Sequence, residues 1–252
     1  MSLQDVVKYW NASPCNIRHS NKQVGTKEYF TEVTERKYIV EPHILDFADF
    51  KKYAAKDILE VGCGIGTAAQ SFIENGAIYK GIDISEESIK IARQRFIVYN
   101  LSGLLDINNI EEMTDYSKQY DLIYSFGVLH HTPDIAKAIE NIYNMLKVEG
   151  EFKLMLYAKN SWKNFSILDK LDQFEAQAHV PIADTYSNDD VYRLLHKFKN
   201  IQILQTHIFP YKIAEYKNYE YVKEDYFECM SKDLFTCLEK NLGWHLCITC
   251  NK

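Results

Sequence analysis

The chain has 252 residues, of which 46% are hydrophobic and 25% charged, a composition that excludes disordered and fibrous proteins and fits one large domain or one domain with a smaller appendage. The net charge of −6 disfavours broad electrostatic binding to nucleic acid, and no apolar run approaches the ~18 residues that a membrane span needs. The first residues lack the basic head and apolar stretch of a signal peptide, so we expect a cytoplasmic location with no nucleic-acid or membrane partner.

From residue 57 onward, short apolar runs alternate with segments of helical periodicity, which is typical of βαβ units and a parallel sheet. The expected strands are 57–61, 78–82, 104–108, 121–126, 152–157, 201–208 and 244–249. Helices are expected over about 67–75 and after the cap signals Ser85, Thr132-Pro133 and Ser187, with Gly150 ending the third. We therefore expect an N-terminal helical cap (1–50) and a main domain (51–252), which has its core at 57–157 and a helical, aromatic-rich insertion at 209–243.

A glycine-rich turn follows the first expected strand at Gly62, Gly64 and Gly66. Glycine lets the backbone turn sharply and approach a ligand closely, and the helix amino terminus behind the turn is electropositive. The third glycine comes one residue too early for the dinucleotide motif GxGxxG. Asp83 ends the second expected strand, where a carboxylate can accept both hydroxyls of a ribose. The two features together predict a ligand that contains a nucleoside and needs no pyrophosphate.

Five blocks of the core, in order, resemble the class I S-adenosylmethionine-dependent methyltransferases: LEVGCGIG (59–66), YKGIDIS (79–85), NIEEM (109–113), YDLIYSFGVLHHTPD (120–134) and LKVEGEFKLMLY (146–157). The resemblance implies a Rossmann-like α/β fold whose seven-stranded sheet has an antiparallel last strand. It also implies S-adenosyl-L-methionine as the cofactor, S-adenosyl-L-homocysteine as its product, and a cofactor site over the first two strands. The sequence departs from the family at Val148-Glu149-Gly150, where Pro-Gly-Gly is common, and this affects only a turn.

The resemblance also implies the cofactor-binding residues, which are Glu60, Gly62, Gly64, Gly66, Asp83, Ile84, Asn109, Ile110, Ser125 and Phe126. Asp83 is expected to hold the ribose diol and Ile84 to lie against the adenine. Asn109-Ile110 stands where the family usually has an acid followed by Ala, but the Asn oxygen can still accept from the adenine amino group, with Asp106 as the fallback. For Glu60 two interpretations stay open: it binds near the methionine amino group, or it satisfies amides of the turn.

Two histidines, His130 and His131, follow the fourth expected strand, which is the substrate side in the family. Histidine suits a general base at neutral pH. We expect His131 to be the catalytic one and His130 to pack or cap the next helix. In the alternative interpretation both are structural, and proximity alone gives the rate.

Substrate contacts are expected from two further groups, Tyr9, Trp10, Arg18 and His19 near the amino terminus and Tyr157 and Trp162 after the fifth strand. The first group resembles the lid of some bacterial small-molecule methyltransferases, and Arg18 with His19 can clamp an anionic substrate. In the alternative interpretation that stretch is a solvated loop. Cys247 and Cys250 have CxxC spacing, but they lie in an apolar β-branched run, so we expect a packed strand and no metal site.

These observations favour transfer of a methyl group to an oxygen, with nitrogen next, of a small polar metabolite such as a sugar, nucleotide-sugar or phosphorylated precursor of a surface glycan or natural product. The alternatives are an N-methyltransferase of a small amine and a non-catalytic S-adenosylmethionine-binding protein. An NAD-binding or nucleotide-sugar oxidoreductase is disfavoured by the glycine spacing. We expect a small molecule as the binding partner and a monomer or homodimer.

Overall fold

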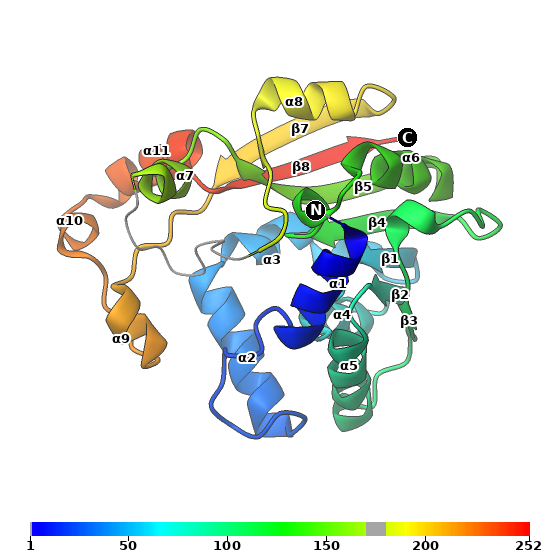
Figure 1. The fold of residues 1–252 in the computed structure, drawn as a ribbon, viewed down its shortest axis with the longest axis horizontal. Coiled ribbons are helices and arrows are strands. Elements are labelled where there is room, and N and C mark those ends of the chain that lie inside the picture. Colours follow the sequence, from blue (N-terminus) through cyan, green and yellow to red (C-terminus); the bar gives the residue numbers. More distant parts are fainter. Residues whose placement is uncertain (1, 170–179) are drawn as a thin grey trace.

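One mixed β-sheet runs through the centre of the computed structural model, which describes residues 2–169 and 180–252 (Figure 1). Neighbouring strands follow the order β3-β2-β1-β4-β5-β8-β7, and a short strand β6 pairs with β5 outside this path. The strands are β1 (Asp57–Val61), β2 (Ile78–Asp83), β3 (Leu104–Ile107), β4 (Tyr120–Phe126), β5 (Leu146–Ala158), β6 (Thr185–Tyr186), β7 (Lys199–Thr206) and β8 (His245–Asn251).

The strand pairing confirms the expected Rossmann-like α/β class. Strand β1 pairs in parallel with β2 and β4, whereas β8 runs antiparallel between β5 and β7. The two-residue strand β6, which the sequence did not indicate, adds an eighth strand to the expected seven. The chain builds β2 and β3 on one side of β1 and then continues with β4 on its other side. Such a switch point leaves a crevice at the carboxyl ends of the strands.

Helices cover both faces of the sheet (Figure 1). They are α1 (Leu3–Ala12), α2 (Lys27–Val40), α3 (His43–Ala48), α4 (Thr67–Glu74), α5 (Glu86–Tyr99), α6 (Ile135–Met145), α7 (Trp162–Leu168), α8 (Asn188–Leu194), α9 (Ile213–Lys217), α10 (Asp225–Glu228) and α11 (Lys232–Leu242), with 3-10 turns η1 (Phe50–Tyr53), η2 (Ile110–Glu112) and η3 (Leu129–His131). Within residues 2–169 and 180–252, none of them combines the length and the apolar character that crossing a bilayer requires.

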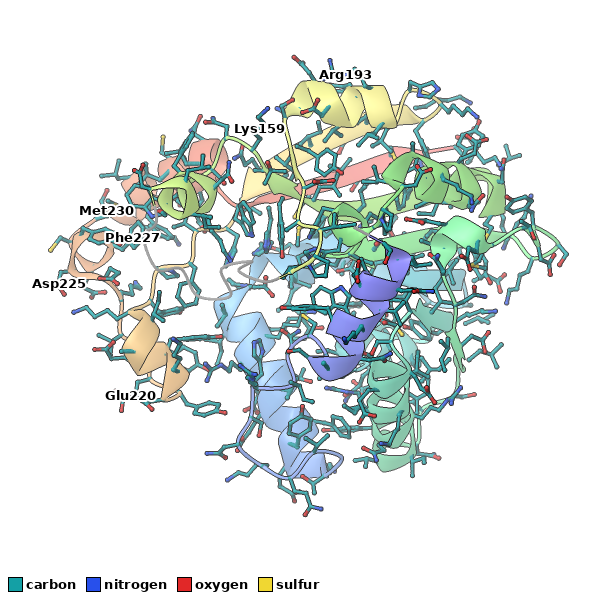
Figure 2. All side chains as sticks on the ribbon, in the orientation of Figure 1. Lys159, Arg193, Glu220, Asp225, Phe227 and Met230 are labelled. Atoms are coloured by element: carbon teal, nitrogen blue, oxygen red, sulfur yellow. The ribbon has the colours of Figure 1, made fainter. Side chains whose placement is uncertain are left out.

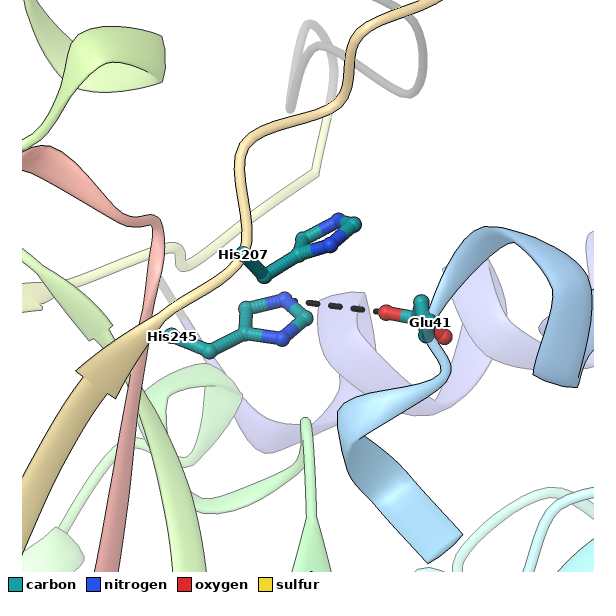
Figure 3. A group of neighbouring side chains, drawn as sticks. All are labelled: Glu41, His207 and His245. Atoms are coloured by element: carbon teal, nitrogen blue, oxygen red, sulfur yellow. Dashed lines mark ion pairs between the residues drawn. The ribbon is translucent and has the colours of Figure 1, made fainter. Parts of the chain in front are cut away.

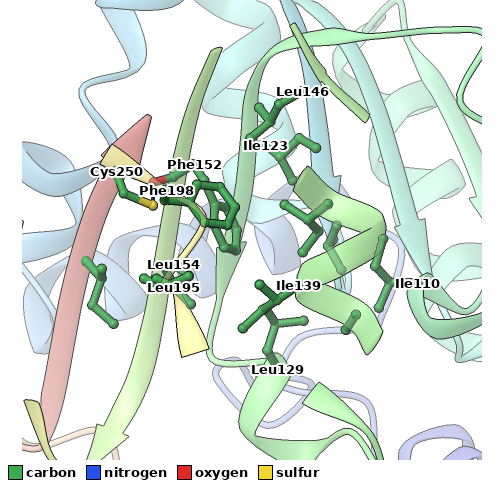
Figure 4. Packing of buried hydrophobic residues seen from close by; sticks show 14 of the residues in the cluster. Ile110, Ile123, Leu129, Ile139, Leu146, Phe152, Leu154, Leu195, Phe198 and Cys250 are labelled. Carbon is green, nitrogen blue, oxygen red and sulfur yellow. Dashed lines mark hydrogen bonds between the residues drawn. The ribbon is translucent and has the colours of Figure 1, made fainter. Parts of the chain in front are cut away.

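The hydrophobic core lies in two layers, one on each side of the sheet. Because successive strand residues point to opposite faces, Leu59 packs in the layer with Ile139 of α6 (Figure 4). Its neighbour Ile58 packs in the opposite layer with Phe72 of α4 and Ile89 of α5. Burial on both faces explains why the central strands read as nearly continuous apolar runs rather than alternating ones.

The boundaries of α6 differ from the prediction. Thr132 does not cap this helix. Asp134 is the N-cap, and its side chain accepts from the Lys137 amide (3.0 Å), while the Thr132 hydroxyl donates to the Leu129 carbonyl (2.7 Å). Nor does Gly150 end the helix, since it lies inside β5 where a Cβ atom would be 3.0 Å from the Tyr120 carbonyl. Gly150 therefore permits a close approach of β5 to β4.

A buried cation, Arg95 of α5, ties the N-terminal helices to the core. Its guanidinium donates to the Ile65 carbonyl in the glycine turn (3.0 Å), to the Thr34 hydroxyl (2.9 Å) and to the Gln70 side chain (2.9 Å). It also lies over the ring of Phe30, with its central carbon 4.5 Å from the ring centroid. Because the side chain is fully buried, these acceptors depend on it for their hydrogen bonds.

We predict that Arg95→Ala lowers the free energy of unfolding by about 3 kcal/mol, because several buried acceptors lose a charged donor at once. Arg93→Ala is the matched control, since Arg93 lies on the same helix, is exposed and makes one such bond, to the Leu105 carbonyl (3.0 Å). Urea unfolding of both variants provides the measurement. Equal losses in the two variants would show that Arg95 has no special role in the fold.

Candidate functional site

A cleft opens at the carboxyl ends of β1, β2 and β4, where the strand order reverses. It contains about 1080 Å³ of space free of atoms, a volume that includes open solvent at its mouth. The predicted cofactor residues that line it are Glu60, Gly62, Gly64, Asp83, Ile84, Asn109, Ile110 and Phe126. Gly66 and Ser125 lie behind this surface, Gly66 as the residue before α4 and Ser125 buried within β4.

The turn between β1 and α4 needs its glycines for two different reasons. Gly62 and Gly64 have φ of +75° and +52°, a region that residues with side chains rarely adopt. At Gly62 there is also no room, since an added Cβ would lie 2.2 Å from Cγ2 of Val128. At Gly64 nothing lies within 4 Å of such an atom. The backbone at Gly64 is thus open to a ligand.

Asp83 at the end of β2 is anchored by two backbone amides. Its Oδ2 accepts from the amide of Gly64 (2.9 Å) and its Oδ1 from the amide of Ser85 (2.8 Å). Burial nevertheless raises the pKa of this carboxyl above its ordinary value. Each carboxylate oxygen has a second lone pair, so the group can still accept two hydroxyls.

Glu60 in β1 is a buried acid in the wall of the cleft. Its Oε2 accepts from the hydroxyl of Tyr79 (2.5 Å), and burial raises the pKa of the carboxyl to about 7. This hydrogen bond to a side chain, together with the position in the cleft wall, favours the first of the two interpretations of Glu60, a contact with the ligand. An acid with this pKa is only half ionised at pH 7, and a nearby ligand cation would complete its ionisation.

Asn109 faces the cleft with its amide group oriented differently from the expectation. Its Oδ1 accepts from the amide of Glu111 (3.0 Å), so the oxygen is already used within η2. The buried Nδ2 has no hydrogen-bond partner in the described part of the chain. The group that Asn109 offers a ligand is therefore a donor rather than the acceptor that its place in the sequence suggested.

The two histidines after β4 occupy different environments. His131 lines the cleft, and its Nδ1 lies 2.5 Å from the carbonyl of Ile182, so Nδ1 carries the proton and Nε2 keeps its lone pair. Burial lowers the pKa of His131 to about 4. His130 is fully buried and lies against the ring of Tyr157, with centroids 3.7 Å apart. Of the pair, His131 alone is placed to contact a ligand in the cleft.

Comparison with known proteins identifies the core. Residues 59–152 match the family described as methyltransferase domain. The ubiquinone biosynthesis O-methyltransferase of Coxiella burnetii (strain Dugway 5J108-111) is 31% identical over 96 residues, which are 38% of this chain and 41% of the relative. The corresponding protein of Neisseria meningitidis serogroup C (strain 053442) is 26% identical over 175 residues, 58% of this chain and 73% of the relative.

A solved structure extends the likeness of the fold beyond this core. The magnesium protoporphyrin IX methyltransferase from Synechocystis PCC 6803, solved with bound S-adenosylmethionine, superimposes with a TM-score of 0.60 at 14% identity and covers 100% of this chain and 98% of its own. The sequence match to a methyltransferase domain is thus confined to residues 59–152, whereas the likeness of the fold covers the whole chain. The chain spans about two fifths of the length of the first curated relatives that it matches.

Helix α1 lies across the mouth of the cleft. The hydroxyl of Ser85 lies within hydrogen-bond distance of two acceptors on α1, the Trp10 carbonyl (3.2 Å) and the Asn11 side chain (3.1 Å). Trp10 lines the cleft and its ring contacts that of His131, with centroids 5.2 Å apart. Tyr9 packs against Trp10 without lining the cleft. Helix α1 therefore joins the β2 side of the cleft to the β4 side.

The other expected substrate residues lie outside the cleft. Arg18 is exposed and its carbonyl accepts from the hydroxyl of Tyr219 (3.2 Å), while His19 is buried away from the cleft. Trp162 contacts the ring of Phe227 (centroids 5.6 Å apart), and Tyr157 lies between His130 and Trp244. Arg18 and His19, the expected anion clamp, thus do not line the cleft. A role of these two residues in substrate binding stays a prediction.

Lys37 of α2 is a cleft residue that the sequence did not indicate. Its Nζ lies 5.7 Å from the ring centroid of Phe126, and its charge acts on Glu60. The residue lies in a helix outside the five blocks that carry the family resemblance, and no motif around it in the sequence indicates a site. It supplies a positive charge in the wall of the cleft.

We predict that Gly62→Ala lowers the free energy of unfolding more than Gly64→Ala does. Gly64→Ala costs about 1 kcal/mol of backbone strain, whereas Gly62→Ala costs more than about 2 kcal/mol because the methyl group also collides with Val128. Urea unfolding measures both. If the two variants lost the same free energy of unfolding, the close packing of Gly62 against Val128 would be contradicted.

Proposed function

We propose that the protein is an S-adenosylmethionine-dependent methyltransferase that transfers the methyl group to an oxygen, with nitrogen as the alternative atom, of a small polar molecule. The observation that carries the proposal is the Asp83 carboxylate, which is fixed by two amides in the wall of a cleft and retains lone pairs for a ribose diol. The match of residues 59–152 to the methyltransferase domain family supports it. The magnesium protoporphyrin enzyme, whose fold is similar, was solved with this cofactor.

The cleft residues fit such a cofactor from end to end. Ile84 and Ile110 provide apolar surface for an adenine ring, and the Nδ2 of Asn109 is free to donate to a ring nitrogen. Glu60 faces the region where the methionine amino group would lie, and burial makes a positive partner favourable there. When bound, S-adenosylmethionine supplies an electrophilic methyl carbon on a positively charged sulfur.

The chain's own contribution to the reaction is alignment and proton acceptance. An acceptor hydroxyl would attack the methyl carbon from the side opposite to the sulfur, so that the carbon–sulfur bond breaks as the carbon–oxygen bond forms and S-adenosylhomocysteine leaves. The proton of the hydroxyl must also leave in this step. The Nε2 of His131 can take that proton, since Nδ1 is held by the Ile182 carbonyl. A pKa of about 4 keeps the ring neutral above pH 5, so the lone pair is available at physiological pH. Helix α1 with Trp10 restricts the acceptor to a small molecule.

The acceptor proposed from these features is a polar metabolite that carries a hydroxyl, such as a sugar, a nucleotide-sugar or a phosphorylated precursor of a surface glycan or natural product. Lys37 in the cleft wall provides a cation for a negatively charged group of such a molecule. A methyl-transfer screen with hydroxylated and amine acceptors, read as S-adenosylhomocysteine formation, identifies the class. Tight cofactor binding without turnover on any acceptor would favour the non-catalytic alternative.

We predict that the protein binds S-adenosylhomocysteine but not NAD in calorimetry, and that Asp83→Ala weakens this affinity about 10- to 100-fold, the equivalent of one charged hydrogen bond. Asp106→Ala is the matched control, because Asp106 lies in the adjacent strand β3, pairs with Lys80 (2.8 Å) and, although it was the fallback acceptor for the adenine, does not line the cleft. Binding of NAD, or an affinity that Asp83→Ala leaves unchanged, would contradict the proposal.

The raised pKa of Glu60 predicts a pH-dependent affinity. The free protein holds this group with a pKa of about 7, and the ammonium of the bound cofactor would lower it, so binding releases a proton. Affinity for S-adenosylhomocysteine should therefore rise about tenfold from pH 6 to pH 8.

Glu60→Gln, which keeps an oxygen for the Tyr79 hydroxyl, should abolish this rise, whereas Glu112→Gln at an exposed acid should not. Calorimetry at three pH values measures the effect. A rise that persists in Glu60→Gln would show that another group binds the ammonium.

A further inference from the structure

A second group of polar side chains, Glu41, His207 and His245, is shown in Figure 3. Glu41 follows α2, His207 follows β7, and His245 begins β8. One oxygen or ring nitrogen from each of the three residues lies within 4.8 Å of those of the other two. Nε2 of His245 and Oε1 of Glu41 are 3.7 Å apart. Three distant parts of the chain therefore bring together donor atoms of the kinds that bind metals.

The orientation of His245 is fixed by another histidine. Nε2 of His43 lies 3.0 Å from Nδ1 of His245. When His245 Nδ1 carries the proton and donates to His43, its Nε2 has a lone pair on the side of Glu41. Histidines that bind metals usually donate their second nitrogen in this way, which fixes the ring and its tautomer. The tautomer of His245 that donates a hydrogen bond to His43 is thus also the one whose Nε2 can bind a cation.

The spacing and the access suit a small divalent ion. Zinc bonds of about 2.0–2.2 Å to nitrogen and oxygen place neighbouring ligand atoms about 3.3 Å apart in a tetrahedron. The 3.7 Å pair is close to this value, and the other pairs, which are no more than 4.8 Å apart, need to close by at most about 1.5 Å. Both histidines are buried, with 7% and 3% of their surface exposed, whereas Glu41 is one-fifth exposed and gives an ion a path from solvent.

We propose that Glu41, His207 and His245 bind a divalent transition-metal ion, zinc in the first place, and that its fourth position takes an anionic oxygen ligand. Two neutral imidazoles and one carboxylate leave a bound dication with one net positive charge. Lys163 acts on both histidines and Lys37 on His43, so the surroundings add positive charge that an anion offsets. No metal site was expected from the sequence.

The position of this site connects it to the cleft. The ring of Phe126 lies 5.5 Å from that of His245 and also lines the cleft. A metal ion bound by His245 would therefore be separated from the cleft by about one aromatic side chain. Metal binding itself does not depend on the proposed methyl transfer, and its measurement needs neither cofactor nor acceptor.

Cobalt(II) provides a direct test, because the ion substitutes for zinc and its visible absorption reports the coordination. Chelator-treated protein titrated with Co²⁺ should develop the intense visible bands of a four-coordinate site at one ion per chain, and Zn²⁺ should displace the cobalt. His207→Gln and His245→Gln should each remove the bands. His43→Gln should weaken the affinity about 10- to 100-fold, as expected for an orienting partner.

Two controls separate this site from other binding. His196→Gln changes an exposed histidine that bonds the Arg193 carbonyl, and it should leave the titration unchanged. Unfolding of every variant by urea shows whether a loss of metal reflects a loss of fold. Absence of visible bands, persistence of the bands in folded His207→Gln and His245→Gln, or a near-ultraviolet thiolate band from the exposed Cys15, Cys229 or Cys237 would each overturn the proposal. Binding of S-adenosylhomocysteine by metal-free protein leaves the proposed function standing in every case.

Discussion

The hydrogen bond from the amide of Gly64 to the carboxylate of Asp83 is the contact on which the cleft depends, because it joins the turn after β1 to the end of β2. On the opposite side of the turn, Arg95 donates to the carbonyl of Ile65. A carboxylate and a guanidinium thus hold neighbouring peptide groups of one short glycine-rich segment. Glycine gives that segment its left-handed conformation, and these two charged side chains restrict it to a single one.

The same arrangement sets the electrostatics of the cleft. Asp83 and Glu60 are both acids whose pKa burial raises, and they lie in the walls of one pocket. Buried carboxyl groups without a cationic partner are costly, and a ligand with a positive amino group and a sulfonium relieves that cost. Lys37, whose charge acts on Glu60, and the neutral His131 line the same cleft. The cleft therefore contains two buried acids suited to a cationic cofactor, one lysine cation and a neutral imidazole.

Local patterns in the sequence predicted the fold well. They did not predict which residues from distant parts of the chain come together. The βα alternation, the turn at Gly62–Gly66 and Asp83 depend on residues close together in the chain, and the structure puts them where they were expected. Arg18 and His19 were assigned from the polar character of their stretch and its resemblance to a lid, and Trp162 from its place after the fifth strand. In the structure Trp162 instead contacts Phe227, within residues 209–243.

The cluster of Glu41, His207 and His245 was missed for the same reason. No two of these residues stand at a spacing that marks a metal site, and only the antiparallel return of β8 brings two of them together. The predicted start of α6 was wrong for a different reason. The hydroxyl of Thr132 donates to the Leu129 carbonyl in η3, and the helix begins later, with Asp134 as its N-cap, which the order of residue types does not reveal.

A crystal structure with S-adenosylhomocysteine tests the central claim most directly, since that claim concerns where one ligand sits. The account predicts both ribose hydroxyls within hydrogen-bond distance of the Asp83 carboxylate, the adenine between Ile84 and Ile110, and the sulfur directed toward Phe126. Electron density for the ligand at another surface, or in this cleft with the ribose turned away from Asp83, would contradict it.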